Sequence, residues 1–280
     1  MTGISHDDPL HGWGQDDFTR YLEKCRHNQL ATFANMRSEV IDLTAIDKMF
    51  VTLLKDAVYP DPVVPMDFLR RAHSAFLTAG GAIMAGQIYE AQSLLRVCLE
   101  QGGYAHFIGK NVGRGNRWRA RHNGSAEKKK VRKEFTNGNI SRQMKAKAPK
   151  LEAAYSEFYD RLIDNGAHPN ERGMSLSSSI EKTDDGGENW MTIYLHGVGL
   201  PMQAGFRTAA QVGLLVLLIA QDIYPDRMQA PGIQDLLNDM KWVFRVLMAE
   251  KFLPYGIITF LIIISAQCAF FNSNCDEVAK

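Results

Sequence analysis

Apolar residues recur at helical spacing along most of this chain, and this periodicity most limits the folds open to it. Residues three, four and seven positions apart share one face of a helix, so each such segment predicts an amphipathic helix. No internal repeat at a fixed period accompanies the pattern. We therefore expect an all-α, multi-helix bundle. The clearest apolar face consists of Ile233, Leu236, Leu237, Met240, Val243, Phe244, Leu247 and Met248.

Proline and glycine mark where these helices begin and end. Three prolines within residues 60–65 must stop the first helix, and Pro65 is suited to open the next one. Gly86 is the predicted turn after the second helix, and Asn165-Gly166 is the predicted stop after the fourth. The third helix is expected to end near Gly102. The expected helices are residues 43–57, 66–84, 88–102, 151–162, 202–222 and 233–248.

The segment 170–189 is rich in Ser, Asp and Gly and predicts a mobile polar loop. The sequence WMTIYLHG that follows it fits a short strand or the start of a helix equally well. With 45% hydrophobic residues, 280 residues are enough for one large domain with an insertion. The expected parts are a polar N-terminal arm (1–38), the first half of a helical bundle (39–109), a basic insertion (110–150), the second half of the bundle (151–252), and an apolar helix with a short tail (253–280).

The charges are distributed unevenly. Residues 110–150 contain 14 Lys and Arg against two acidic residues, a net charge of +12, whereas the remainder has 18 basic and 29 acidic residues, a net charge of −11. Arginine clusters interleaved with Trp118 and Phe135 favour contact with RNA or another polyanion. The alternative is a solvated insertion that only balances the acidic remainder. The candidate contact residues are Arg114, Arg117, Trp118, Arg119, Arg121, His122, Lys128, Lys129, Lys130, Arg132 and Lys133.

Four scattered cysteines without a CxxC pair, and an acidic, polar N-terminal stretch, favour a reducing cytoplasmic setting. The sequence predicts no metal site and no cofactor. His6 and His11 are five residues apart in a polar segment, no HExxH motif occurs, and GVGLPMQAG lacks the Lys-Ser/Thr of a phosphate loop.

Arg96 and Glu100 lie one turn apart on an otherwise apolar helix. They fall on the arc opposite Ile88, Leu95 and Leu99, which favours a solvent-exposed ion pair contributing roughly 0.2–0.5 kcal/mol. Val97 and Tyr104 flank the same arc, however, so the pair could instead face a polar cleft between helices. The sequence leaves both interpretations open.

The run GQIYEAQSLLRVCLE, with the later YSEFYDRLIDNGAHPN, resembles an uncharacterised family of bacterial all-helical proteins. Its pattern is a G-x-x-x-E-A-x-x-L-x-R-x-x-x-E helix followed by a helix ending in His-Pro, over roughly residues 65–170. The family is also distantly similar to HEPN-type domains, many of which are dimeric ribonucleases and others only binding modules. The matching residues are Gly86, Glu90, Ala91, Leu94, Arg96, Glu100, Tyr159, Leu162, His168 and Pro169.

This resemblance implies that Arg96, Glu100 and His168 converge, and that the protein is a homodimer. HEPN-type ribonucleases use an Arg-x4–6-His pair, in which His moves the proton of a ribose 2′-hydroxyl and Arg stabilises phosphate charge without a metal. Three pairs have this spacing, and Arg161 with His168 is best placed because the His directly follows a helix. The polar residue that often follows the Arg is replaced by Leu162. The other pairs are Arg20 with His27 and Arg117 with His122.

Residues 253–271 form an uncharged apolar stretch of 19 residues, close to the length that spans a bilayer. A tail anchor with the main domain in the cytoplasm and a buried core helix are both consistent with it. The sequence thus supports two functions. The first is an HEPN-like protein that contacts RNA or another polyanion, with metal-independent ribonuclease activity. The second is a non-catalytic helical scaffold or interaction protein, with a membrane anchor as one form.

Overall fold

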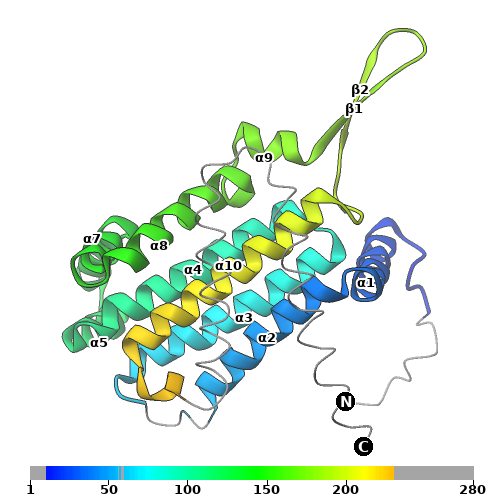
Figure 1. Cartoon of the computed structure of the whole chain (residues 1–280). Helices are drawn as coiled ribbons and strands as arrows, with labels where there is room; N and C mark the ends of the chain where they lie inside the picture. The colour runs from blue at the N-terminus through cyan, green and yellow to red at the C-terminus, as the bar shows by residue number, and fades with distance from the viewer. Residues whose placement is uncertain (1–10, 56, 58–59, 230–280) are drawn as a thin grey trace, which may run out of the picture. The chain divides into compact units, whose positions relative to one another are not determined.

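The computed structural model describes residues 11–55, 57 and 60–229, and it is mostly helical, as predicted (Figure 1). The helices are α1 (Asp17–Asn35), α2 (Arg37–Leu54), α3 (Val63–Ala85), α4 (Ile88–Gly109), α5 (Val112–Arg119), η1 (Ala120–His122), α6 (Ser125–Glu134), α7 (Asn137–Lys147), α8 (Pro149–Leu162), η2 (Ile163–Ala167), α9 (Glu171–Leu176), α10 (Leu200–Ile223) and η3 (Asp226–Gln229). The strands are β1 (Ser178–Lys182) and β2 (Glu188–Thr192).

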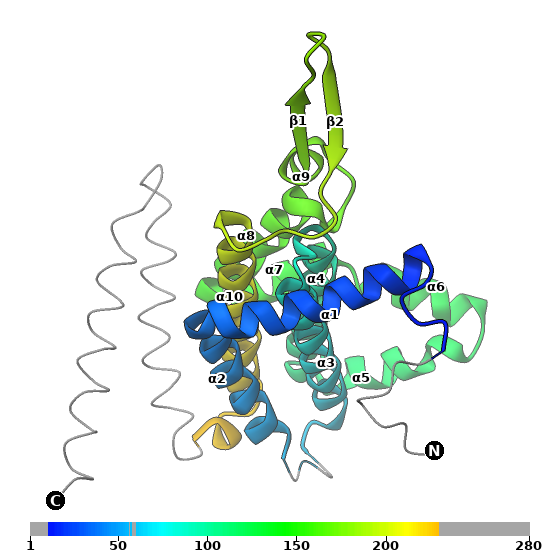
Figure 2. The same cartoon turned by 90° about the vertical axis from the view of Figure 1, so that its right-hand side faces the viewer.

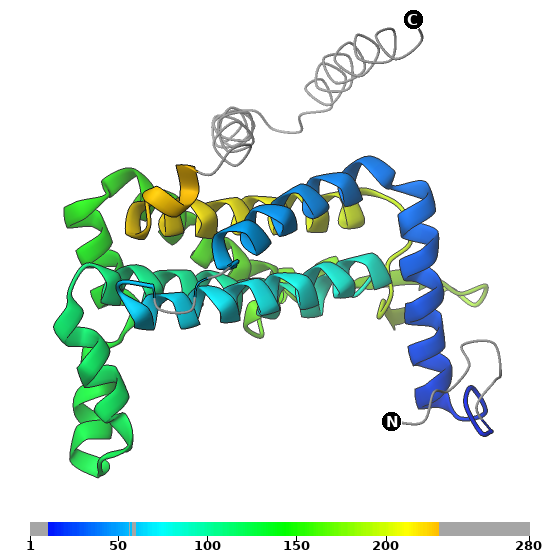
Figure 3. The same ribbon diagram turned by 90° about the horizontal axis from the view of Figure 1, so that it is seen from below.

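Four long helices, α2, α3, α4 and α10, form the core of the described part (Figures 1 and 3). Buried residues lie on almost every side of α10, because it packs against the other three helices. Glycines make this close packing possible. A Cβ on Gly213 would lie 2.8 Å from side-chain atoms of Ile46 and Phe76, and a Cβ on Gly205 would lie 2.9 Å from Ile88.

Two predicted turns are confirmed. Gly86 ends α3 with a φ of 92°, and Gly166 follows α8 with a φ of 133°. Both values lie in the left-handed region, which only glycine adopts without strain. The helices expected at 43–57 and 202–222 are present as α2 and α10, and α3 begins at Val63, two residues before Pro65.

The predicted end of the third helix near Gly102 is wrong, because α4 continues to Gly109. Gly102 and Gly103 are buried inside α4, where they allow other helices to come close. A Cβ on Gly102 would lie 3.0 Å from Val216 of α10, and a Cβ on Gly103 would lie 2.7 Å from the hydroxyl of Tyr155 in α8. The two glycines therefore serve helix packing.

The expected polar N-terminal arm contains the helix α1, which crosses one end of the core (Figure 3). Polar side chains hold it there. Asn28, Gln29 and Thr32 donate hydrogen bonds of 2.9, 3.0 and 2.9 Å to the carbonyls of Ala85, Gly81 and Met84 at the end of α3. These bonds cap the carbonyl end of α3.

The loop expected over residues 170–189 is instead the short helix α9 and a β-hairpin that extends away from the bundle (Figure 2). β1 and β2 pair antiparallel, with Ile180 directly opposite Trp190. The first three residues of WMTIYLHG, 190–192, belong to β2, so this part of the sequence forms a strand. The turn contains Gly186 with a φ of 83°.

The residues expected as a basic insertion form α5, η1, α6, α7 and the beginning of α8. The helices α5 and α6 project from the end of the core opposite α1 (Figure 3). Val131, Phe135, Ile140 and Met144 are buried, so α6 and α7 have apolar contacts of their own beneath their basic surface.

Within the described residues, α10 has the length and apolarity of a membrane span. However, 72% of its apolar 18-residue stretch is buried in the bundle. A buried core helix passes the same test. The helix expected at 233–248 and the apolar stretch 253–271 lie outside the described residues.

Candidate functional site

A hydrogen-bonded network joins Arg96 and Glu100 of α4 to Tyr159 of α8. The Nε of Arg96 donates to the Glu100 carboxylate at 3.0 Å, and its Nη2 donates to the hydroxyl of Tyr159 at 3.1 Å. That hydroxyl in turn donates to the same Glu100 oxygen at 3.2 Å. The ion pair predicted from the i,i+4 spacing is therefore present, and it faces a neighbouring helix.

The network is partly buried. The side chains of Arg96 and Glu100 are 27% and 35% exposed. Burial opposes the charged form of Arg96, but the hydrogen bond and charge of Glu100 outweigh it and raise the pKa of Arg96. Burial, reinforced by the Glu100 charge, raises the pKa of Tyr159. At neutral pH, Tyr159 is thus a neutral phenol that can donate to Glu100.

The turn after α8 supplies a further contact to Arg96. The carbonyl of Ala167 accepts a hydrogen bond of 3.4 Å from Nη1 of Arg96. Gly166 makes this turn possible, because a Cβ there would lie 2.8 Å from the ring of Tyr89. The turn at Gly166 and the side chain of Arg96, which are far apart in the sequence, therefore lie next to each other.

His168 directly follows this turn, so its main chain lies beside Arg96 while its imidazole is exposed. Its Nδ1 lies 3.3 Å from the carbonyl of Pro169. Arg161 points elsewhere: its guanidinium donates to Glu157 at 3.0 Å and to Gln211 of α10 at 3.4 Å. The structure thus brings the His168 backbone close to Arg96, and it directs Arg161 towards α10.

The candidate basic residues fall into three groups. Arg114 and Arg117 approach Glu134 at 3.5 and 2.6 Å, and Lys130 pairs with Glu127 at 2.6 Å. Arg121 lies over the ring of Trp118, 5.5 Å from its centroid. The remaining candidates are exposed and form no ion pair within the described residues: Arg119, His122, Lys128, Lys129, Arg132 and Lys133.

Trp118 and Phe135, expected to stack on bases, belong to an aromatic cluster instead. The ring of Trp118 lies 5.4 Å from those of Phe68 and Tyr104 and 5.2 Å from that of Phe135, centroid to centroid. Phe135 is buried. These contacts attach α5 and α6 to α3 and α4, so the aromatic side chains hold the basic helices in place.

A second group of titratable residues joins α4 to α10. His106 is fully buried, and its Nε2 lies 3.0 Å from the carboxylate of Asp222, which also receives Lys110 at 2.9 Å. Burial, together with the charge of Lys110, lowers the pKa of His106 against the opposing effect of Asp222. Its Nδ1 has no hydrogen-bond partner among the described residues. We interpret this group as a structural link, because the imidazole is closed to solvent.

No group of three or more His, Cys, Asp or Glu side chains is placed to hold a metal ion among the described residues. Comparisons with protein-family models, with curated proteins and with solved structures found no match for this chain. The resemblance to the bacterial helical family and to HEPN-type domains therefore stays a prediction.

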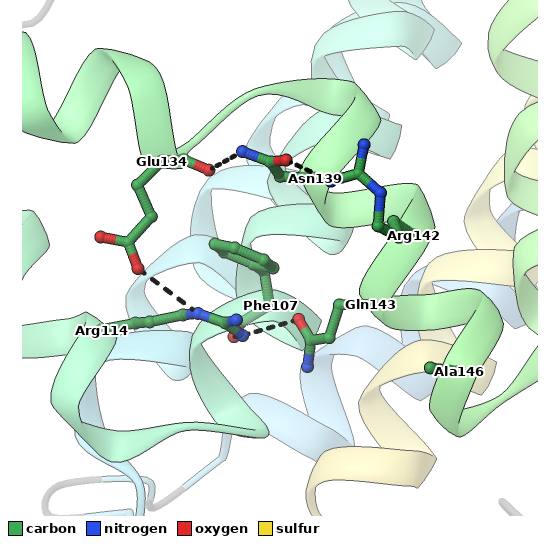
Figure 4. Close-up of a pocket in the computed structure, with 7 residues that line it drawn as sticks. All are labelled: Phe107, Arg114, Glu134, Asn139, Arg142, Gln143 and Ala146. Atoms are coloured by element: carbon green, nitrogen blue, oxygen red, sulfur yellow. Dashed lines mark hydrogen bonds and ion pairs between the residues drawn. The ribbon is translucent and has the colours of Figure 1, made fainter.

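Sequence reasoning missed one polar helix face in the basic region. Asn139, Arg142 and Gln143 of α7, with Ala146 one turn further on, line a cavity together with Phe107, Arg114 and Glu134 (Figure 4). The spacing of three and four residues places the three polar side chains on one side of a helix. That polar periodicity was a usable signal, although only the structure shows that Arg114 lies across from it.

We predict that Tyr159→Phe lowers the free energy of unfolding by about 1–2 kcal/mol, because one hydroxyl makes both the Arg96 and the Glu100 contact. Urea unfolding followed by circular dichroism measures the change. Tyr194→Phe is the matched control, since the Tyr194 side chain is exposed. Equal unfolding midpoints in the two variants would contradict the network.

Proposed function

We propose that residues 110–150 form a nucleic-acid contact surface. The observation that carries this proposal is the exposed, unneutralised charge on α6. Lys128, Lys129, Arg132 and Lys133 are exposed and have no ion pair within the described residues. Four cations on one short helix favour phosphate contacts, because binding releases counterions condensed on the nucleic acid.

The helical framework of this region supports the proposal. Val131 and Phe135 anchor α6 through buried contacts, so its cations are held on a folded surface. A folded surface loses less conformational freedom on binding than a flexible tail does. Since Trp118 packs among Phe68, Tyr104 and Phe135, the contact is with phosphates, and we expect little dependence on base sequence.

We predict that reversing four charges weakens binding of a single-stranded RNA at least roughly tenfold and flattens its salt dependence. Fluorescence anisotropy over a salt series gives both quantities. Lys130 is left intact because it pairs with Glu127. The variant carries Lys128→Glu, Lys129→Glu, Arg132→Glu and Lys133→Glu.

A control variant makes the same change in net charge at exposed basic residues outside the region. Equal loss of affinity in both variants would show that total charge, and no local surface, drives binding. Unchanged affinity in the α6 variant would refute the proposed surface. The control positions are Lys24, Lys48, Arg172 and Lys182.

RNA cleavage is the finer form of this proposal. The exposed imidazole of His168 and the bond from Arg96 to the preceding carbonyl support it. In this mechanism His168 takes the proton of a ribose 2′-hydroxyl, whose oxygen attacks the neighbouring phosphorus. The 5′-oxygen then leaves and takes the proton from the protonated His168, which gives a 2′,3′-cyclic phosphate and a 5′-hydroxyl. Arg96 stabilises the phosphate charge.

For this activity we predict that His168→Ala slows cleavage of single-stranded RNA by roughly 100-fold or more, the scale of general acid–base catalysis, while EDTA has no effect. The His27→Ala variant, changed at an exposed histidine outside residues 110–150 that has the same spacing from an arginine, should cleave normally. Wild-type protein that leaves the RNA intact contradicts cleavage and leaves nucleic-acid binding as the function.

A second candidate function is that of a dimeric interaction protein, and the β-hairpin favours it. Trp190 is 72% exposed, and Ile180 opposite it and Met191 beside it are exposed as well. A two-stranded hairpin has two unpaired edges, which readily accept another strand. Antiparallel pairing of β2 with β2 of a second copy, centred on Trp190, would set Glu188 opposite Thr192, so no like charges would face each other.

We predict that the wild-type chain is a dimer and that Trp190→Asp makes it monomeric, because the change places a charge at the centre of this pairing. Light scattering coupled to size-exclusion chromatography measures the mass. Leu77→Asp, at an exposed apolar residue of α3, should stay dimeric. A monomeric wild-type chain refutes the hairpin dimer.

A further inference from the structure

A cavity of about 370 Å³ opens to solvent between the end of α4 and the helices α5, α6 and α7. Figure 4 shows Arg114 and Glu134 on one side of it, and Arg142, Gln143 and Ala146 on the other, with Phe107 between them. The volume lies in the range of roughly 300–1,000 Å³ typical of small-molecule sites. A ligand larger than a single ion therefore fits.

Positive charge exceeds negative charge around this cavity. Glu134 accepts two hydrogen bonds from Arg117, at 2.8 and 2.6 Å, and these bonds lower the pKa of Glu134. Arg114 shares that one carboxylate at 3.5 Å. Arg142 bonds to the amide oxygen of Asn139 at 2.7 Å and has no carboxylate partner among the described residues. Two arginines, Arg114 and Arg142, thus line the cavity together with a single carboxylate, which Arg117 also binds.

The cavity lining keeps unused hydrogen-bond donors, whereas two of its acceptors already bind Arg114. The carbonyl of Phe107 and the amide oxygen of Gln143 both accept from Nη1 of Arg114 at 2.8 Å. This leaves the amide NH₂ of Gln143 and further N–H groups of Arg142 for a ligand. The Nε of Arg114 is buried and lies 3.5 Å from the Glu134 carboxylate, where it forms an ion pair but no hydrogen bond. A site with spare donors and occupied acceptors suits an anion.

Arg114 is held in place by the residues beneath it. Its guanidinium carbon lies 3.6 Å from the centroid of the Phe107 ring, and its side chain is 19% exposed. Burial and the nearby charge of Arg117 lower the pKa of Arg114, and Glu134 opposes them only in part. A bound anion would supply the missing compensation.

We propose that this cavity binds the phosphate group of a nucleotide, with Arg142 and Gln143 as direct donors and Arg114 as the buried counter-charge. Arginine recognises phosphate through paired hydrogen bonds, and the space beyond the phosphate accommodates a nucleoside. This inference rests on the proposed nucleic-acid surface, of which the cavity is one defined subsite. The phosphate comes from a free nucleotide or from the end of an RNA strand.

Isothermal titration of the full chain with AMP, adenosine and inorganic phosphate tests the site. We expect AMP to bind, adenosine not to bind, and phosphate to compete with AMP. Arg142→Gln and Gln143→Ala should each weaken AMP binding by roughly tenfold or more, the scale of a lost hydrogen bond to a charged group. Arg114 stays unchanged, since it also bonds within the fold.

Lys145→Gln is the matched control, because Lys145 is exposed on the same helix and does not line the cavity. Absence of AMP binding to the wild-type chain, or equal losses in Arg142→Gln and Lys145→Gln, would overturn the proposal. Melting temperatures check that each variant is folded. The Gln143→Ala variant keeps the net charge, so a loss there cannot come from long-range electrostatics.

A second set of measurements distinguishes a free nucleotide from an RNA end as the source of the phosphate. It also separates failure of the cavity proposal from failure of the proposed nucleic-acid surface. If the site takes RNA ends, a 5′-phosphorylated RNA binds more tightly than its 5′-hydroxyl form, and Arg142→Gln removes the difference. If RNA binding depends on α6 but AMP does not bind, the cavity proposal fails alone. If AMP binds but RNA does not, the proposed function fails alone.

Discussion

The close packing of α4 against both α10 and α8 is the constraint on which the rest of the described structure depends. Gly102 and Gly103 present no side chain at these two contacts, so Val216 and Tyr155 reach the α4 backbone. Because α8 lies this close, Tyr159, one turn after Tyr155, meets Arg96 and Glu100. A larger residue at Gly103 would force Tyr155 to shift, and one at Gly102 would press on Val216, since packed interiors hold few voids that could absorb it.

Helical periodicity was sufficient to predict most of the long helices, and it failed where polar contacts or backbone packing decide the structure. Glycine spacing predicts a helix end at the two glycines of α4, because a sequence does not distinguish a helix break from a close approach of two helices. The helix α1 was missed because amides and hydroxyls dock it onto α3, as Asn28 and Gln29 do, and no broad apolar stripe marks it. The hairpin was missed because its strands are largely exposed and so lack alternating burial.

The candidate sites were predictable only in part, for a related reason. The spacing of Arg96 and Glu100 predicts their ion pair, since local helix geometry fixes it. Their contact with Tyr159 requires a second helix, which spacing alone does not locate. The same limit applies to Trp118, because an aromatic residue among arginines suits both base stacking and core packing. Only the contacts with Phe68 and Tyr104 assign it to packing.

The positive charge of residues 110–150 has two physical roles, and one carboxylate separates them. Glu134 forms ion pairs with both Arg114 and Arg117, and these pairs hold α5 against the end of α6. One acid cannot neutralise two arginines, and Lys128, Lys129, Arg132 and Lys133 of α6 add charge that forms no ion pair in the described part of the chain. Such a surplus disfavours the isolated fold through self-repulsion and is relieved when an anion binds. A charge surplus that weakens folding but strengthens anion binding favours a binding role for this region over simple balancing of the acidic remainder.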